Sequence, residues 1–204
     1  MKDDIYVLAH EVKNPLCVVK GYLQMLDESN FLKYKEIINN QVDDSLSILN
    51  DYLEFNRIGL IKEEFDLNVL LSELKNNLKD YLKSNNVHLH INEMDDEIYL
   101  DGDYNKLKQV FHNIIKNSVE SKSKNIEISY RIMFGKVTIC ISNDGYKINN
   151  DDLYKIGNYF TNKESGHGIG TRLIKKIVSL HNGKIKYRNN KKRGVSVYIT
   201  LSLS

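Results

Sequence analysis

His10 combines a reactive side chain with an unusual helical setting. Apolar residues recur every three or four positions across residues 5–26, which predicts a helix with one buried stripe. At about 100° per residue, His10 falls opposite that stripe, with Asn14 one turn later and Glu11 beside it. Pro15 interrupts the backbone hydrogen bonding of the same helix. The pattern predicts a reactive imidazole on a deformable helix; the alternative is a surface histidine beside a helix-bending proline.

Two asparagines in the middle of the chain could hold a metal ion. Asn113 and Asn117 are four residues apart in a segment with a helical apolar pattern, so both amides project from one face. An amide carbonyl is a hard oxygen ligand, of the kind that Mg²⁺ takes alongside water. The alternative is chance, because the chain is rich in asparagine.

A glycine-rich run could bind phosphates. Gly166, Gly168 and Gly170 open a predicted helix over residues 169–180, whose free N–H groups and positive dipole end attract anions. The spacing matches neither GxxxxGK[ST] nor GxGxxG, which excludes a P-loop and disfavours a Rossmann site. The alternative is a flexible loop that enters a helix.

The composition excludes several classes of protein. The 29 Lys and Arg residues nearly balance 27 Asp and Glu residues, so the net charge of +2 makes no case for nucleic acid or an anionic membrane. Hydrophobic residues make up 41% of the chain, enough for a core, yet no run reaches the ~18 apolar residues of a membrane span. No signal peptide is visible. Cys17 and Cys140 have no metal-site spacing, which favours a reduced, cytoplasmic protein.

Two amphipathic segments must position His10. The second runs over residues 38–53, and a short polar link joins it to the first, which predicts an antiparallel helical hairpin. One hairpin buries its apolar stripes poorly, so we expect a homodimer in which two hairpins form a four-helix bundle. The alternative is that the stripes pack against the C-terminal half of the same chain.

The remaining chain alternates between helices and strands after a link near residues 56–64. This order predicts an α+β fold with one mixed sheet and helices on one of its faces. The expected elements are helices over residues 66–83, 104–121 and 169–181, and hairpins formed by 87–92 with 97–100, 126–133 with 136–142, and 184–188 with 195–203.

Read as strings, these segments resemble a known family. LAHEVKNPLCVVKGYLQML resembles the phosphoacceptor box of bacterial sensor histidine kinases, especially sporulation-type kinases. KLKQVFHNIIKNSVES, ISNDGYKI and NYFTNKESGHGIGT resemble, in order, the N, G1, F and G2 boxes of the ATP-binding domain of that family. The resemblance implies a dimerisation and phosphotransfer hairpin in residues 1–60. It also implies a catalytic α/β sandwich of the Bergerat (GHKL) fold, shared with gyrase and Hsp90, in residues 61–204.

The resemblance also implies roles for individual residues. His10 would be phosphorylated by ATP, Glu11 would accept its proton, and Asn14 would position water for a phosphatase reaction. Asn117 would bind Mg²⁺. The other residues implied at the nucleotide are Asn113, Asn143, Gly145, Phe160, Thr161, Lys163, Gly166, Gly168 and Gly170.

Two residues depart from the family pattern. Asn143 stands where the G1 box has an aspartate that accepts from the adenine amino group, and Lys147 replaces the second glycine of that box. The amide carbonyl of Asn143 can still accept this hydrogen bond, but without charge, so we expect weaker adenine binding.

The resemblance implies a histidine kinase core that passes the phosphoryl group to an aspartate of a response-regulator receiver domain. The alternatives are a phosphotransferase, a regulator phosphatase or binding module with a degenerate nucleotide domain, or a helical docking dimer without chemistry. Only nine residues precede His10. We therefore expect either the soluble part of a longer, membrane-anchored kinase or a short form driven by a partner.

Overall fold

The computed structural model describes residues 2–57, 59–92, 97–153, 156–157 and 169–204. The chain divides into two compact units. The first contains residues 1–58 and 160–170, and the second contains residues 59–159 and 171–204. Among the described residues, no helix is both long and apolar enough to cross a membrane.

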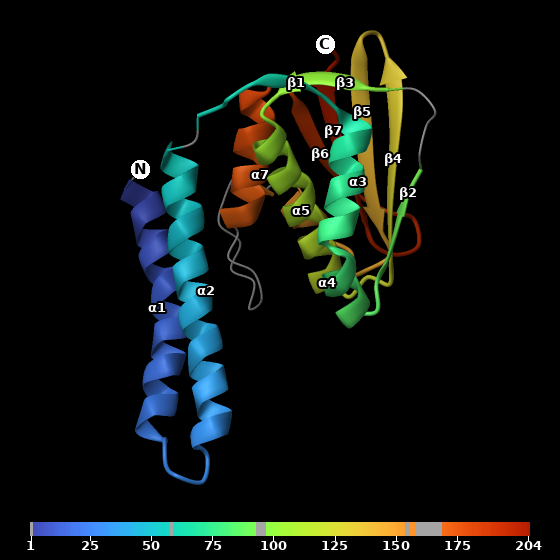
Figure 1. Cartoon of the computed structure of the whole chain (residues 1–204). Coiled ribbons are helices and arrows are strands. Elements are labelled where there is room, and N and C mark those ends of the chain that lie inside the picture. The colour runs from blue at the N-terminus through green and yellow to red at the C-terminus, as the bar shows by residue number, and fades with distance from the viewer. Residues whose placement is uncertain (1, 58, 93–96, 154–155, 158–168) are drawn as a thin grey trace. The chain divides into compact units, whose positions relative to one another are not determined.

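The first unit is built on the predicted helical hairpin. Helices α1 (Lys2–Gln24) and α2 (Phe31–Arg57) run antiparallel along each other (Figure 1). In the link, the Asp27 carboxylate accepts hydrogen bonds from the backbone N–H groups of Ser29 and Asn30, at 2.8 and 3.0 Å. Tyr22 and Tyr34 then meet edge to face, with ring centroids 4.8 Å apart, where the two helices leave the link.

The two helices bury one apolar face and expose another. Ile48 is fully buried, and Pro15 is buried on the face of α1 that carries Tyr22. Two residues of the stripe predicted on α1, Leu16 and Leu23, are 46% and 54% exposed, as expected for one hairpin that covers its stripes poorly. Helix α2 has a matching exposed stripe, formed by Val42, Leu46, Leu49 and Leu53. A single hairpin therefore leaves a continuous apolar surface uncovered.

The second unit is a mixed sheet with helices on one face, as predicted. Its strand order is β2-β4-β5-β7-β6, and all neighbours are antiparallel except β2 and β4, which are parallel. Figure 1 shows α3 and α5 side by side in front of the sheet. The strands are β2 (His88–Ile91), β4 (Asn125–Met133), β5 (Lys136–Asn143), β6 (Lys184–Asn189) and β7 (Val195–Ser202). The helices are α3 (Leu67–Asn77), α4 (Lys79–Ser84), α5 (Tyr104–Glu120), α6 (Asn150–Leu153) and α7 (Ile169–Leu180).

One predicted hairpin is wrong. Residues 97–100 do not pair with residues 87–92. Instead, β3 (Tyr99–Gly102) pairs antiparallel with β1 (Glu63–Asp66), a strand that the sequence did not predict. Strand β1 buries only Phe65, so it lacks the alternation of apolar residues that marks a strand. The helix predicted over residues 66–83 is also divided, at Leu78, into α3 and α4.

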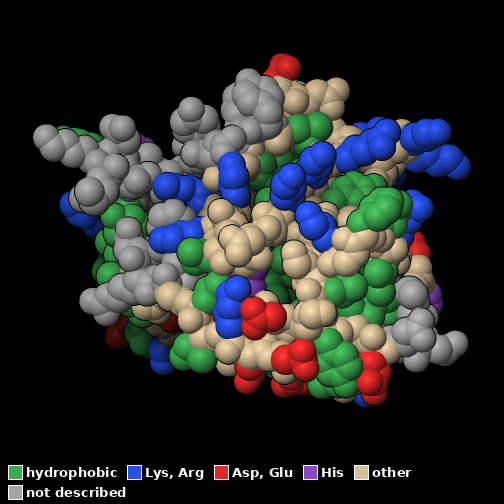
Figure 2. Space-filling model, turned by 90° about the horizontal axis from the view of Figure 1, so that it is seen from above, with side chains coloured by type: hydrophobic (Ala, Val, Ile, Leu, Met, Phe, Trp, Pro, Cys, Tyr) green, Lys and Arg blue, Asp and Glu red, His purple; other side chains and the backbone are tan. Residues whose placement is uncertain are grey.

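The face of the sheet away from the helices is polar and charged. Along β6, every second residue is exposed, and these residues are Lys184, Lys186 and Arg188. The ribbon of β1 and β3 is acidic instead, with Glu63, Glu64 and Asp101 exposed. Figure 2 shows Asp and Glu side chains gathered toward one side of the face that it views, and Lys and Arg side chains toward the other.

Candidate functional site

Helix α5 presents the two predicted asparagines to solvent. Asp103 caps its first turn, because the carboxylate accepts from the Lys106 N–H at 3.0 Å. The buried face consists of Leu107, Val110, Phe111, Ile114, Ile115, Ser118 and Val119. Asn113 is half-buried and Asn117 is exposed, and neither amide has a hydrogen-bond partner in the described part of the chain. Their hard oxygens are therefore available to a ligand.

The loop after β5 packs against the C-terminal end of α5. Gly145 is buried there, and a Cβ at this position would lie 2.5 Å from the backbone oxygen of Ser121. The Tyr146 N–H donates to the same oxygen at 2.8 Å. Asn143 joins this contact through its side-chain N–H, which donates to the Ser118 hydroxyl at 3.0 Å. The fold thus brings Asn143 and Gly145 to the helix that carries Asn117.

Asp144 has a structural role instead. Its carboxylate accepts from the backbone N–H groups of Lys124 and Asn125, at 2.7 and 3.0 Å, and from the Asn125 side chain at 2.7 Å. Burial alone would raise the pKa of this carboxyl, but the hydrogen bonds from Asn125 and Lys124 outweigh it and lower the pKa. The Asp144 carboxylate therefore holds the loop after β5 against the first residue of β4.

Lys147 ties the same loop to the turn between β6 and β7. Its ammonium donates to the backbone oxygen of Lys191 at 2.9 Å, and the side chain lies at the surface. Lys147, which stands where the family has a glycine, therefore adds a contact between two loops, and its side chain does not fill the space beside α5.

Of the glycine-rich run, the structure describes Ile169 and Gly170. Gly170 lies half-buried in the first turn of α7, and no atom of the described residues lies within 4 Å of the position of a Cβ. The other predicted residues of this region lie outside the described residues; they are Phe160, Thr161, Lys163, Gly166 and Gly168.

His181, which directly follows α7, is buried at a junction between elements. Its Nε2 accepts from the Asp103 N–H at 2.9 Å, and its Nδ1–H donates to the Ile177 oxygen at 2.8 Å. The Asp103 carboxylate also accepts from the Ile61 N–H at 2.9 Å, which ties the start of the unit to α5. The uncharged imidazole therefore joins α7 to the cap of α5, and Asp103 in turn joins that cap to the segment before β1.

We expect acid to weaken this junction. Burial lowers the pKa of His181, and Lys62 lowers it further, against the opposing effects of the Ile177 carbonyl, Asp103 and Asp101. Because the folded pKa lies below the unfolded value of about 6.5, the stability from His181 is complete above that pH. It is lost as the pH falls through the folded value, by at most about 1.4 kcal/mol per pH unit.

The measurement is urea unfolding between pH 5 and pH 8, for wild type and for His181→Gln, whose side chain keeps an acceptor without titrating. The wild type should lose more stability than the variant below pH 6.5. Parallel pH profiles would contradict the assignment.

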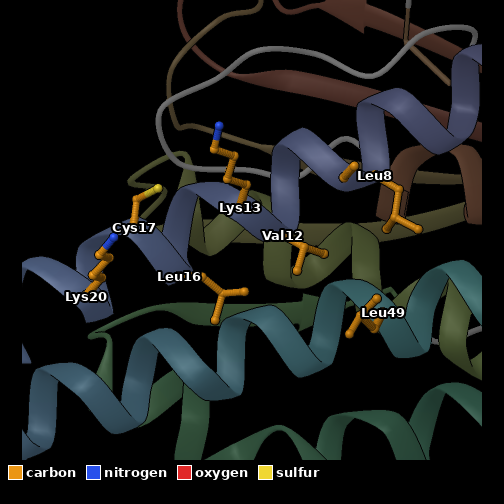
Figure 3. Close-up of a pocket in the computed structure, with 8 residues that line it drawn as sticks. Leu8, Val12, Lys13, Leu16, Cys17, Lys20 and Leu49 are labelled. Atoms are coloured by element: carbon orange, nitrogen blue, oxygen red, sulfur yellow. The ribbon is translucent and has the colours of Figure 1, made fainter.

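The hairpin holds the other predicted residues. His10 and Asn14 are exposed one turn apart on α1, as predicted, and Glu11 lies in α1 with a side chain outside the described set. Beside them, a groove of about 460 Å³ runs between α1 and α2. Figure 3 shows Val12, Leu16 and Leu49 directed between the helices, whereas Lys13 and Cys17 point away from them.

Comparisons with known proteins match both halves of the chain. Residues 5–60 match the His Kinase A (phospho-acceptor) domain, and residues 102–204 match the histidine kinase-, DNA gyrase B-, and HSP90-like ATPases. The chain is 31% identical to sensor protein DegM of Bacillus sp. (strain B21-2), over 96% of this chain and 53% of DegM. It is 30% identical to Sporulation kinase B of Bacillus subtilis (strain 168), over 95% of this chain and 48% of that kinase. The chain therefore spans about half the length of these relatives.

Solved structures agree with these matches. Histidine kinase ThkA, in complex with response regulator protein TrrA, matches with a TM-score of 0.83 and 25% identity, over 99% of this chain and 61% of that chain. Acinetobacter baumannii histidine kinase AdeS shares the fold, with a TM-score of 0.73 and 22% identity, over 96% of this chain and 98% of that chain. The resemblance inferred from the motifs is thus confirmed, and the chain belongs to the histidine kinase family as a phospho-acceptor module followed by an ATP-binding module.

Proposed function

We propose that this chain is the core of a two-component sensor kinase that phosphorylates His10 with ATP and passes the phosphoryl group to an aspartate of a response regulator. The supporting observation is an exposed His10 within a phospho-acceptor module, in the same chain as an ATPase-family module. Residues 1–60 are the dimerisation and phosphotransfer hairpin, and residues 61–204 are the catalytic domain. A cytoplasmic location belongs to this proposal and is supported by the unpaired thiols of Cys17 and Cys140.

In the first reaction, an imidazole nitrogen of His10 forms a bond to the γ-phosphorus while the bond from that phosphorus to ADP breaks. Glu11 accepts the proton that the imidazole releases. In the second, the phosphoryl group moves from His10 to the regulator's carboxylate. Asn14, exposed one turn from His10, positions water for the phosphatase reaction.

The nucleotide lies against α5 and the loop after β5. The amide of Asn117, exposed and without a hydrogen-bond partner among the described residues, suits Mg²⁺, whose charge offsets that of the phosphates when it is bound. Asn113, Asn143 and Gly145 complete the described part of this site. By the family resemblance, the nucleotide is also bound by Phe160, Thr161, Lys163, Gly166, Gly168 and Gly170.

The test of this function is incubation of the wild-type chain with γ-labelled Mg·ATP. A phosphohistidine is stable in alkali and lost in acid, so the expected label has both properties. Transfer is tested by adding a purified receiver domain and following the loss of label from the chain. Absence of label on the wild type would favour the alternative of a regulator phosphatase or binding module with a degenerate nucleotide domain.

The exposed stripe of the hairpin supports a homodimer. Leu16 and Leu23 on α1 are seven residues apart, and Val42, Leu46, Leu49 and Leu53 continue the apolar surface on α2. Two copies that bring these stripes together form a four-helix bundle with one core.

Leu46→Lys is expected to dissociate this dimer. A symmetric interface contains the substitution twice, and each lost leucine contact costs about 1.5 kcal/mol or more, so the affinity should fall about hundredfold. Light scattering should show twice the chain mass of 23.7 kDa for wild type and a single chain mass for the variant. Val18→Lys, at a 41% exposed position on the opposite side of α1, is the control and should stay dimeric.

A further inference from the structure

The amide of Asn143 is held in one orientation by three neighbours. Its Oδ1 accepts from the backbone N–H groups of Gly145 and Val195, at 3.1 and 3.2 Å. Its Nδ2 donates to the Ser118 hydroxyl, at 3.0 Å. A flipped amide would direct its NH₂ group at two backbone donors, so hydrogen-bond chemistry fixes the orientation.

Ser118 reinforces this arrangement from the core. Its side chain is 2% exposed, and its hydroxyl hydrogen is donated to the Ile114 oxygen at 2.9 Å. The hydroxyl oxygen is therefore left to accept, which suits the NH₂ group of an amide and not a carboxylate. Asn143 and Ser118 form a matched donor and acceptor.

These contacts limit the polar atoms that Asn143 can offer to a ligand. Both lone pairs of its carbonyl oxygen are engaged, and one of its two N–H groups is donated to Ser118. The side chain is half-buried. Among the described residues, the one polar group of this side chain that remains is a single N–H donor. An aspartate at the same position would offer only acceptors.

We propose that Asn143 presents an N–H donor to the nucleotide base, so that the site accepts 6-oxopurine and 6-aminopurine nucleotides with similar affinity. This inference rests on the proposed function, in which Asn143 lies at the base. The 6-amino group of adenine is a donor and needs an acceptor, whereas O6 of guanine or hypoxanthine is itself an acceptor. An N–H at Asn143 pairs with N1 of adenine or with O6 of a 6-oxopurine.

The weak selectivity between these bases follows from the hydrogen-bonding state of the Asn143 carbonyl. A site that hydrogen-bonds a substrate N–H rejects the analogue that lacks it by about 10⁴ or more, because a buried acceptor loses its partner. Here the acceptor of Asn143 is already satisfied by the protein, so removing the amino group leaves nothing unpaired.

The first test uses the wild-type chain with Mg²⁺ and three probes: ATP, ITP and purine riboside 5′-triphosphate, which has no group at C6. Calorimetry or competition with a fluorescent nucleotide gives the three Kd values. We expect ITP and purine riboside triphosphate to bind within tenfold of ATP. A preference for ATP greater than tenfold would overturn the inference, whereas failure of all three to bind would instead contradict the proposed nucleotide site.

The second test uses Asn143→Asp, which replaces the donor with acceptors. The preference for ATP over ITP should rise at least tenfold above that of wild type; a smaller rise in a folded variant would sink the inference. Asn76→Asp, which adds the same charge at an exposed position of α3, is the matched control and should leave the ratio unchanged. Should Asn143→Asp fail to fold, the wild-type ratio decides the inference alone.

Discussion

His10→Gln is expected to abolish the acid-labile label completely. The phosphoryl group needs a nucleophilic nitrogen, and the amide of glutamine has none of useful reactivity. His10 is exposed on α1, so the substitution leaves the packing of the hairpin intact and should change stability by less than about 0.5 kcal/mol. The expected result is a folded, dimeric protein that still binds nucleotide and carries no label.

His90→Gln is the control for His10. His90 is also exposed, on β2, and lies outside the proposed machinery, so this variant should be labelled like the wild type. Label of normal intensity on His10→Gln would show that another residue is the acceptor. Loss of label on both variants would point to an effect on the nucleotide domain instead.

Gly194→Ala is expected to destabilise the second unit by about 3 kcal/mol, the largest effect on folding that we anticipate. The φ of Gly194 is +80°, which costs a residue with a Cβ about 1–2 kcal/mol. The added Cβ would also overlap the backbone oxygen of Asn143, and such overpacking costs about 1–3 kcal/mol. Thermal unfolding should show a Tm lower by roughly 10 °C.

Gly135→Ala separates the two causes. Gly135 has a similar φ of +68° in the turn between β4 and β5, but no atom in the described part of the chain lies within 4 Å of the position of its Cβ. This variant has the conformational cost without the overlap, so its free energy of unfolding should fall by about 1–2 kcal/mol. Equal losses of stability in the two variants would show that close packing against Asn143 contributes nothing.

Helix α5 shows what could be predicted from the sequence. Its extent, Tyr104–Glu120, differs by one residue from the prediction, because local signals agree. Asp103 caps the first turn, and the apolar residues repeat with helical period over four turns. The exposure of Asn117 follows from the same period. Local chemistry thus fixed the helix that carries the proposed metal ligand.

Strand pairing could not be read in the same way. The alternation of His88–Ile91 predicts a strand but does not indicate which strand it pairs with. The predicted partner, the next strand along the chain, was wrong, because β2 pairs with β4. A parallel partner requires a long crossover, usually through a helix. Helix α5 lies between β2 and β4 in the chain, and it was the signal that favoured this pairing.

The orientation of the Asn143 amide could not be predicted from the sequence. The predicted carbonyl acceptor is engaged by the N–H groups of Gly145 and of Val195, which is 52 residues away. The amide nitrogen is held by Ser118, which is 25 residues away. His181 is similar, since its partner Asp103 is 78 residues distant. Spacing along one sequence identifies residue types at a site, whereas tertiary contacts decide which of their atoms remain free.

The charged edge of the sheet affects how the protein behaves at high concentration. Strand β6 is an outer strand, and the unpaired N–H and C=O groups of such a strand invite a strand from another molecule. Lys184, Lys186 and Arg188 place three cations along this edge, so a second β6 that approached it would be repelled. Pairing of two β6 edges is thereby disfavoured, whereas the apolar stripe of the hairpin favours self-association.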